Sequence, residues 1–179
     1  MRSTSRCTVA AVSAHQHRKV GPTSVRAAVL TVSDTRTEAN DESGNHIRST
    51  LTLAGHTVVH HAICPDNPDE VLAHLVRWKQ DGVDVVITTG GTGISRRDTT
   101  YEAIEQLIEK RLDGFGELFR MLSHKDVGSA AMLSRAVAGT LRGGGFVFVL
   151  PGSLNAVTLA MRELILPELG HVAGLTRIP

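Results

Sequence analysis

Short apolar runs alternate along the chain with longer segments in which apolar residues have helical spacing. The runs predict buried strands over 25–32, 56–63, 83–87 and 146–150. The helical spacing predicts helices over 42–54, 68–82, 100–111, 117–124 and 155–169. This alternation is typical of a three-layer αβα domain with a mostly parallel central sheet. Residues 138–145 end in three glycines and could form a hairpin, so we allow one antiparallel strand.

The length of 179 residues suits one domain, which we place at 25–179. The first 26 residues hold five Lys or Arg and no acid, which leaves the rest of the chain mildly acidic. We therefore expect residues 1–24 to be a basic, flexible extension, or an arm for a neighbouring subunit. The same composition superficially resembles a transit peptide.

Composition argues against several functional classes. The chain has only six aromatic residues, too few for the basic and aromatic face of a nucleic-acid binder, and we expect neither nucleic-acid nor membrane binding. No apolar stretch approaches the ~20 residues that cross a bilayer. Cys7 and Cys64 form neither a metal motif nor a disulfide framework, which fits a reducing compartment. We expect a soluble, cytoplasmic protein.

A glycine-rich loop follows the predicted strand 83–87. Its residues, Thr89-Gly90-Gly91-Thr92-Gly93, offer hydroxyls and free N–H groups and let the backbone approach a phosphate closely. Ligands of open α/β sheets bind beyond the carboxyl ends of the strands, so the residues just after each predicted strand have priority. These residues are Ser33, Asp34, Pro65, Asp66, the glycine loop with Asp98, and Pro151-Gly152-Ser153. Together they predict a metal-assisted phosphate site.

Each aspartate also has an ordinary structural role open to it. Asp34 could cap a turn, Asp66 could form an Asx turn, and Asp98 could cap the helix that begins near Thr100. These roles are favoured for any one aspartate alone. The joint placement of the three favours a ligand site.

Common nucleotide and metal motifs do not match. The glycine loop has no Lys-Ser/Thr pair, so it is not a Walker A sequence, and Arg96 replaces the third glycine of a dinucleotide fingerprint. Arg96 and Arg97 could bind phosphate or could simply be solvated. His60 and His61 point to opposite faces of a regular strand, so they cannot jointly bind one zinc ion.

An ordered set of motifs resembles the MoaB/MogA family of molybdenum cofactor biosynthesis proteins over about residues 25–170. The motifs are Leu30-Thr31-Val32-Ser33-Asp34, Thr89-Gly90-Gly91-Thr92-Gly93, Arg97-Asp98, Gly114-Phe115-Gly116-Glu117, Phe119-Arg120, Ser134-Arg135-Ala136 and Leu150-Pro151-Gly152-Ser153. The segment 114–120 and the Pro-Gly-Ser sequence favour the MoaB branch.

The resemblance implies a molybdopterin-binding fold and adenylylation of molybdopterin by Mg-ATP, with release of pyrophosphate. It implies that Asp66 and Asp98 are catalytic and handle Mg²⁺ and phosphate. It also implies that substrate contacts come from Ser33, Asp34, Thr89, Gly90, Gly91, Thr92, Gly93, Ser134, Pro151, Gly152 and Ser153. Mg²⁺ would be the cofactor, with ATP and molybdopterin as substrates.

One departure from the family pattern leaves alternatives open. Related adenylyltransferases continue as Pro-Gly-Asn-Pro or Pro-Gly-Gln-Pro, whereas this chain has Ser153-Leu154, so a hydroxyl replaces an amide. The alternatives are a non-catalytic molybdopterin-binding carrier or scaffold, and another pterin or nucleotide reaction. The resemblance also implies a homotrimer or a dimer of trimers, and contact with other proteins of the cofactor pathway.

Overall fold

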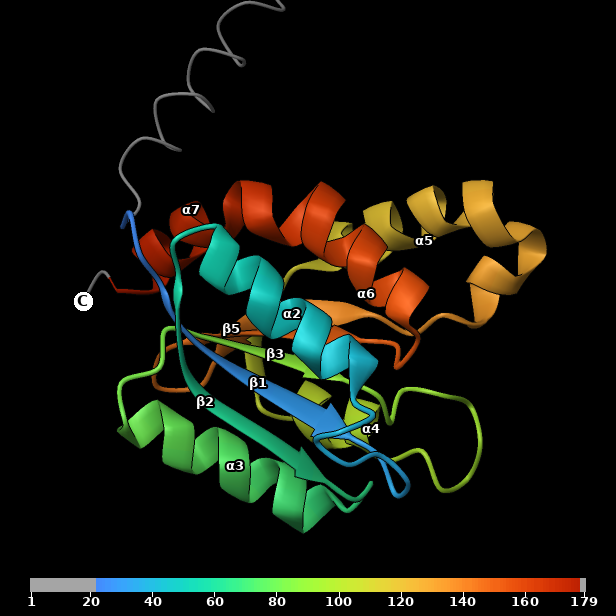
Figure 1. Cartoon of the computed structure of the whole chain (residues 1–179), viewed down its shortest axis with the longest axis horizontal. Helices are drawn as coiled ribbons and strands as arrows, with labels where there is room; N and C mark the ends of the chain where they lie inside the picture. The colour runs from blue at the N-terminus through green and yellow to red at the C-terminus, as the bar shows by residue number, and fades with distance from the viewer. Residues whose placement is uncertain (1–21, 178–179) are drawn as a thin grey trace, which may run out of the picture.

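One mixed sheet forms the centre of the molecule in a computed structural model, which describes residues 22–177 (Figure 1). Most of the predicted extension 1–24 lies outside the described residues. Six strands of this part of the chain, in the spatial order β2-β1-β3-β6-β5-β4, form the sheet. Their bounds are β1 (Arg26–Val32), β2 (Thr57–Cys64), β3 (Val85–Thr89), β4 (Ile108–Arg111), β5 (Val137–Leu141) and β6 (Phe146–Leu150).

The sheet is parallel except for one strand. β5 runs antiparallel to both of its neighbours, β6 and β4, so the single antiparallel strand and the hairpin allowed by the sequence are confirmed. Gly143, Gly144 and Gly145 form the turn of this hairpin with φ of 76°, 108° and 86°. Glycine reaches such angles without steric cost, which is why three of them stand together here.

Helices cover both faces of the sheet and confirm the three-layer arrangement. Figure 1 shows α2, α5, α6 and α7 on one side and α3 and α4 on the other. The bounds are α2 (Glu42–Leu53), α3 (Pro68–Gln80), α4 (Thr100–Glu105), α5 (Asp113–Val127), α6 (Leu154–Ala160) and α7 (Leu166–Thr176), with the short turns η1 (Gly128–Leu133) and η2 (Met161–Ile165).

Each face of the sheet has its own apolar core. One includes Phe115 and Phe119 of α5, which are buried against Phe148 of β6 and the helices α2, α6 and α7. The other joins Leu75 and Trp78 of α3 to the opposite face of the sheet. The parallel strands are therefore buried on both sides, which explains why they appear as nearly unbroken apolar runs in the sequence.

The predicted helix over 100–111 is wrong in its second half. α4 ends at Glu105, and β4 follows as an edge strand paired with β5. Leu107 and Ile108 still pack on an apolar core, so the spacing that predicted a helix indicated burial correctly. The Leu107 carbonyl accepts a hydrogen bond from the Arg142 N–H at 3.1 Å, and such long-range pairing overrides the local pattern.

The helices predicted over 117–124 and 155–169 are longer in the structure. The first is α5, which begins at Asp113, and the second runs from Leu154 through a π-helical turn at Met161–Ile165 to Thr176. Pro167 stands in the first turn after this π-helical segment, where proline is tolerated because its position needs no intrahelical N–H donor.

A carboxylate before β3 joins the two ends of the described chain. Asp84 accepts hydrogen bonds from the Arg26 N–H at 2.8 Å and from Arg177 Nε at 2.7 Å. Burial acts to raise the pKa of Asp84, but the hydrogen bonds and charges of Arg177 and Arg26 outweigh it and hold this pKa below its ordinary value. The ionised form is therefore the one that the fold stabilises.

We expect Asp84→Asn to lower the free energy of unfolding at pH 7 by about 1–2 kcal/mol. The lowered pKa means that this contribution is complete above the unfolded value of about 3.9 and is lost as the pH falls further. Urea unfolding at pH 7 and pH 3 measures both effects, with exposed Asp69→Asn as the control. A difference between wild type and Asp84→Asn that is as large at pH 3 would contradict the ionic role.

Candidate active site

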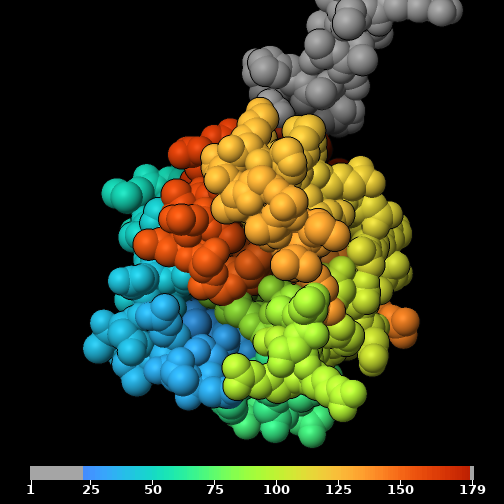
Figure 2. Space-filling model, turned by 90° about the vertical axis from the view of Figure 1, so that its right-hand side faces the viewer, coloured from blue at the N-terminus to red at the C-terminus, as the bar shows by residue number. Residues whose placement is uncertain are grey.

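The register of the sheet brings the predicted site segments to one edge. Thr31 of β1 lies beside Thr89 of β3, and Thr89 lies beside Leu150 of β6. On the other side, Val32 pairs with Cys64 of β2. The segments that follow β1, β2, β3 and β6 therefore start side by side. Figure 2 looks onto this edge, where the segments after β1 (blue), β3 (yellow-green) and β6 (orange) meet.

The start of the glycine loop lies in close contact with the ends of β1 and β6. Gly90 has φ of 98°, and a Cβ there would collide with the Val32 carbonyl oxygen. The Gly90 N–H donates to the Leu150 carbonyl at 3.1 Å. Position 90 therefore needs glycine both for its conformation and for its close contact with β1.

The turn after β6 packs on the same loop. Thr89 Oγ1 donates to the Pro151 carbonyl at 3.0 Å, and a Cβ at Gly152 would lie 3.3 Å from Gly90 Cα. Ser43, in the first turn of α2, donates its hydroxyl to the Gly152 carbonyl at 3.0 Å. Three segments distant in sequence are thus joined around the glycine loop.

Asp66 supports the chain that leaves the glycine loop. Its Oδ1 accepts hydrogen bonds from the N–H and hydroxyl of Thr99, at 3.2 and 3.0 Å, and from those of Thr100, at 3.0 and 2.9 Å. Asp66 therefore caps α4, whose own N-cap residue Thr99 makes no side-chain capping bond. Its Oδ2 faces the loop, where a Cβ at Gly91 would lie 2.9 Å away.

The alternative role of Asp66 as an Asx-turn residue is wrong. The neighbouring Asn67 caps α3 by accepting from the N–H groups of Asp69 and Glu70, at 2.9 and 3.4 Å. Pro68 follows at the first helical position, where its fixed φ favours the helix.

Asp98 lies against the other end of the glycine loop. Its Oδ2 accepts from the Ser95 N–H at 3.0 Å, and a Cβ at Gly93 would lie 2.6 Å from the same oxygen. The second carboxylate oxygen has no hydrogen-bond donor within residues 22–177. The alternative in which Asp98 caps α4 is wrong, because Asp66 does this from another loop.

Ser33 and Asp34 lie beside Asp66 and border a small cavity. The Ser33 N–H donates to the Cys64 carbonyl at 2.8 Å, and Asp34 Oδ1 accepts from the Asp66 N–H at 3.3 Å. The Ser33 hydroxyl accepts from the Arg36 N–H at 3.2 Å, which gives the segment a tight turn. A cavity of about 430 Å³ opens between this turn and the end of β2.

The two remaining predicted serines, Ser153 and Ser134, lie next to helical segments, outside the glycine loop. Ser153 is the N-cap of α6, and its hydroxyl accepts from the Ala156 N–H at 3.3 Å. Ser134 is half-buried after η1, and its side chain has no hydrogen bond within the described part of the chain. Thr92 is buried and Gly93 is exposed. Arg96 and Arg97 lie on the exposed part of the loop.

Arg135 is a functional candidate that sequence reasoning missed. Its guanidinium donates to the carbonyls of Thr92, at 2.8 Å from Nε, and of Gly93, and it forms an ion pair with Glu102 of α4. It also stacks on the Tyr101 ring at 4.7 Å. The hydrogen bond with Arg135 lowers the pKa of Glu102 below its ordinary value. The Ser134-Arg135-Ala136 motif could have indicated Arg135, but only its serine was predicted to be a substrate contact.

Asp41 was also missed, although it is only 1% exposed. It caps α2 by accepting from the Gly44 N–H at 2.9 Å and accepts from Thr31 Oγ1 at 2.6 Å. His61 Nε2 lies 3.5 Å from the same carboxylate. The start of the predicted helix 42–54 was the signal that could have found it, because a helix needs a cap at this position.

The strand histidines lie as the alternation of side chains predicts. His61 faces Asp41, whereas His60 faces α3, where it stacks on Trp78 and its Nε2 lies 3.0 Å from Asp81. The two rings do not share a site. Across residues 22–177, no cluster of three or more His, Cys, Asp and Glu side chains could hold a metal ion.

Comparison with known proteins agrees with this geometry. Residues 28–171 match the family model described as "Probable molybdopterin binding domain". The chain belongs to the MoaB/MogA family of molybdenum cofactor biosynthesis proteins. The family resemblance found in the sequence motifs is therefore confirmed.

Relatives in this family match nearly their whole length. The chain is 50% identical over 163 residues to molybdenum cofactor biosynthesis protein B of Bacillus anthracis, covering 90% of this chain and 96% of that protein. A crystal structure of molybdenum cofactor biosynthesis protein B is 51% identical, with a TM-score of 0.80 over 85% of this chain and 95% of that one. The tungsten cofactor synthesizing protein MoaB from Pyrococcus furiosus is 43% identical, with a TM-score of 0.79 over 88% and 99%.

Within residues 22–177, no helix has both the length and the apolar composition needed to cross a membrane.

Proposed function

We propose that this MoaB/MogA family member transfers the adenylyl group of ATP to molybdopterin, giving adenylyl-molybdopterin and pyrophosphate. The observation that carries the proposal is the placement of Asp66 against Gly91 and of Asp98 against Gly93 of one glycine loop, at the sheet edge where ligands of such folds bind. We further propose that the protein acts in the cytoplasm.

In the proposed reaction, covalent bonds form and break only between the two substrates. An oxygen of the terminal phosphate of molybdopterin attacks the α-phosphorus of ATP and forms a new P–O bond. The bond from that phosphorus to the bridging oxygen breaks, and the electron pair leaves with pyrophosphate. Catalysis then depends on holding the phosphates in line and on stabilising their charge.

The residues that we propose for substrate contact fall into three groups. The glycine loop, Thr89 to Gly93, would bind phosphate through its N–H groups. Ser33 and Asp34, with the Pro151-Gly152-Ser153 turn, would form the walls on either side of the loop. Ser134 would be a further contact.

Mg²⁺ is the cofactor that we propose, and the available donors fit it. Magnesium in phosphate-transfer sites is held by one or two carboxylates together with substrate phosphates and water. Asp98 has one carboxylate oxygen without a donor in the described chain, and the four hydrogen bonds that the Asp66 carboxylate accepts all use Oδ1. When bound, the ion supplies positive charge that stabilises the transferring and leaving phosphates.

The test is incubation of the full-length protein with molybdopterin and Mg-ATP. We expect adenylyl-molybdopterin and pyrophosphate in equal amounts, measured by chromatography and a coupled pyrophosphate assay, and no product after chelation of the metal. Binding of molybdopterin without product at any concentration of Mg²⁺ or Mn²⁺ would overturn the proposal.

One observation favours a molybdopterin carrier as the second candidate. The hydroxyl of Ser153, which stands where related adenylyltransferases have an amide, accepts the Ala156 N–H in capping α6 and offers a ligand one donor where an amide offers two. A carrier would bind molybdopterin in the same pocket without transferring the adenylyl group. The incubation above distinguishes the two functions.

Self-association is the partner interaction that we propose, as a homotrimer or a dimer of trimers. The exposed face of α5 and η1 supports it, because large apolar side chains gather there. These are Leu118, Met121, Val127, Met132 and Leu133. A surface that exposes so many apolar groups is typical of an interface.

Arg135 is expected to position the glycine loop for the proposed reaction. Arg135→Met should raise the KM for Mg-ATP about tenfold, because the loop loses its only forked contact to the carbonyls of Thr92 and Gly93 in the described chain. Arg135→Lys should recover only part of the loss, since an ammonium cannot form the fork. Steady-state kinetics measure the KM, with Arg162→Met in η2 as the control. Wild-type kcat/KM in Arg135→Met would exclude the role.

A further inference from the structure

The outer edge of β2 is an open strand edge in the described sheet, and the pairing of β2 with β1 shifts register once, at Val59. β2 is eight residues long and pairs only with β1 in the described sheet. Its Cys64 carbonyl accepts from the Ser33 N–H, so by alternation the backbone groups of His61 and Ile63 point away from β1 to the open edge. The opposite edge strand, β4, has four residues, Ile-Glu-Lys-Arg, and is protected by its shortness and charge. β2 has neither protection.

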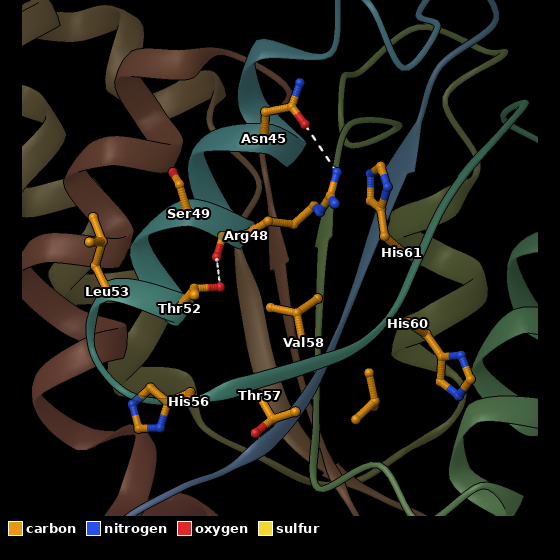
Figure 3. A pocket seen from close by; sticks show the side chains of 11 residues that line it. Asn45, Arg48, Ser49, Thr52, Leu53, His56, Thr57, Val58, His60 and His61 are labelled. Atoms are coloured by element: carbon orange, nitrogen blue, oxygen red, sulfur yellow. Dashed lines mark hydrogen bonds between the residues drawn. The ribbon is translucent and has the colours of Figure 1, made fainter.

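A groove runs along this open edge between β2 and α2 (Figure 3). Its volume is about 940 Å³, and it is lined by Asn45, Arg48, Ser49, Thr52, Leu53, His56 and residues 57–61. Apolar surface is available in it, since Leu53 is 89% exposed and Val58 is half-buried. The groove thus offers backbone groups, apolar contacts and polar side chains to one extended segment.

The charge of the groove indicates what it can accept. Arg48 is the charged side chain among the lining residues, since burial lowers the pKa of His56, His60 faces Asp81 and His61 faces Asp41. None of the lining residues is an acid. The sequence contains no Asp or Glu from position 43 to position 65. Arg48 is exposed, donates to Asn45 Oδ1 at 3.2 Å and has no carboxylate partner within residues 22–177. Figure 3 shows Arg48 and the ring of His61 at the same end of the groove.

We propose that this groove binds an extended acidic segment of another protein, which adds to β2 as an outer strand. Main-chain hydrogen bonds to the open edge supply affinity in such complexes, and the groove side chains supply selectivity. A carboxylate opposite Arg48 would pair with a cation that the described chain leaves without an anionic partner. Alternating apolar side chains would contact Val58 and Leu53.

Two other occupants fit the charge less well. A second copy of the chain, paired edge to edge, would add a second Arg48 and no acid to the groove. The chain's own residues 1–21 contain four Lys or Arg and no acid. Like charges oppose both arrangements.

The test uses the full-length protein and a peptide of acetyl-Glu-Val-Glu-Val-Glu-Val-Glu-amide. The control peptide has Lys in place of each Glu. We expect saturable binding by calorimetry that is at least about tenfold tighter for the acidic peptide, and slower hydrogen exchange at the His61 and Ile63 amides. Arg48→Glu should reverse the preference between the peptides. Lys125→Glu, on the far helix α5, should leave it unchanged.

The same measurements can overturn the proposal. Absence of saturable binding, protection at amides other than those of β2, or an unchanged preference in Arg48→Glu would each do so. If the His61 and Ile63 amides of the free protein exchange more slowly as the protein concentration rises, the edge is occupied by a second copy. Protection that is lost on deletion of residues 1–21 would assign it to the chain's own N-terminal segment. Neither result depends on adenylylation activity.

Discussion

Asp98→Asn is expected to reduce the rate of molybdopterin adenylylation by about 10²-fold or more while leaving the fold intact. The asparagine carbonyl can still accept the Ser95 N–H, so the turn at the end of the glycine loop should persist. What is lost is negative charge at the carboxylate oxygen that has no protein donor in the described chain. Removal of one well-placed electrostatic contact commonly costs this much in phosphoryl and acyl transfer.

Measurement of kcat over a range of Mg²⁺ concentrations, with urea unfolding in parallel, tests this expectation. The free energy of unfolding should lie within about 1 kcal/mol of wild type, since the hydrogen bond is kept. Asp126→Asn, exposed on α5, provides a matched loss of charge outside the site. Equal rates for wild type and Asp98→Asn would remove Asp98 from the catalytic assignment.

The sequence predicted the arrangement of the site because strand register follows from strand order and burial. Four apolar runs marked β1, β2, β3 and β6, and their parallel pairing forces the segments after them to one edge. Polar residues placed just after apolar strands could therefore be grouped without any contact being known. Their roles toward ligands stay predictions.

What the sequence did not reveal depends on contacts between distant segments. Asp66 caps a helix 34 positions further along the chain, at Thr100, and no local capping pattern indicates such a bond. Arg135 donates to the Thr92 carbonyl, and no local pattern indicates that bond either. β4 was assigned to a helix because its apolar side chains share the spacing of α4, and only its pairing with β5 decides between the two. The local spacing of apolar residues predicts which side chains are buried, but it does not predict which distant segments pair.

Asp66 combines a structural and a proposed catalytic role, and two substitutions separate them. Asp66→Ala is expected to lower the free energy of unfolding by about 3 kcal/mol, because it leaves the N–H and hydroxyl of buried Thr100 without an acceptor. Asp66→Asn keeps an acceptor oxygen and should cost only about 1 kcal/mol, the difference between charged and neutral hydrogen bonds. Both should lower adenylylation at least about tenfold, since both remove the charge that faces Gly91.

Urea unfolding and initial rates of pyrophosphate release measure the two roles independently. Asp69→Ala, in the exposed first turn of α3, is the control and should change the free energy of unfolding by no more than about 1 kcal/mol. Wild-type stability in Asp66→Ala would show that the cap of α4 is not needed. A stable Asp66→Asn with full activity would show that the loop needs only the hydrogen-bond acceptor, and the metal-binding assignment would then rest on Asp98 alone.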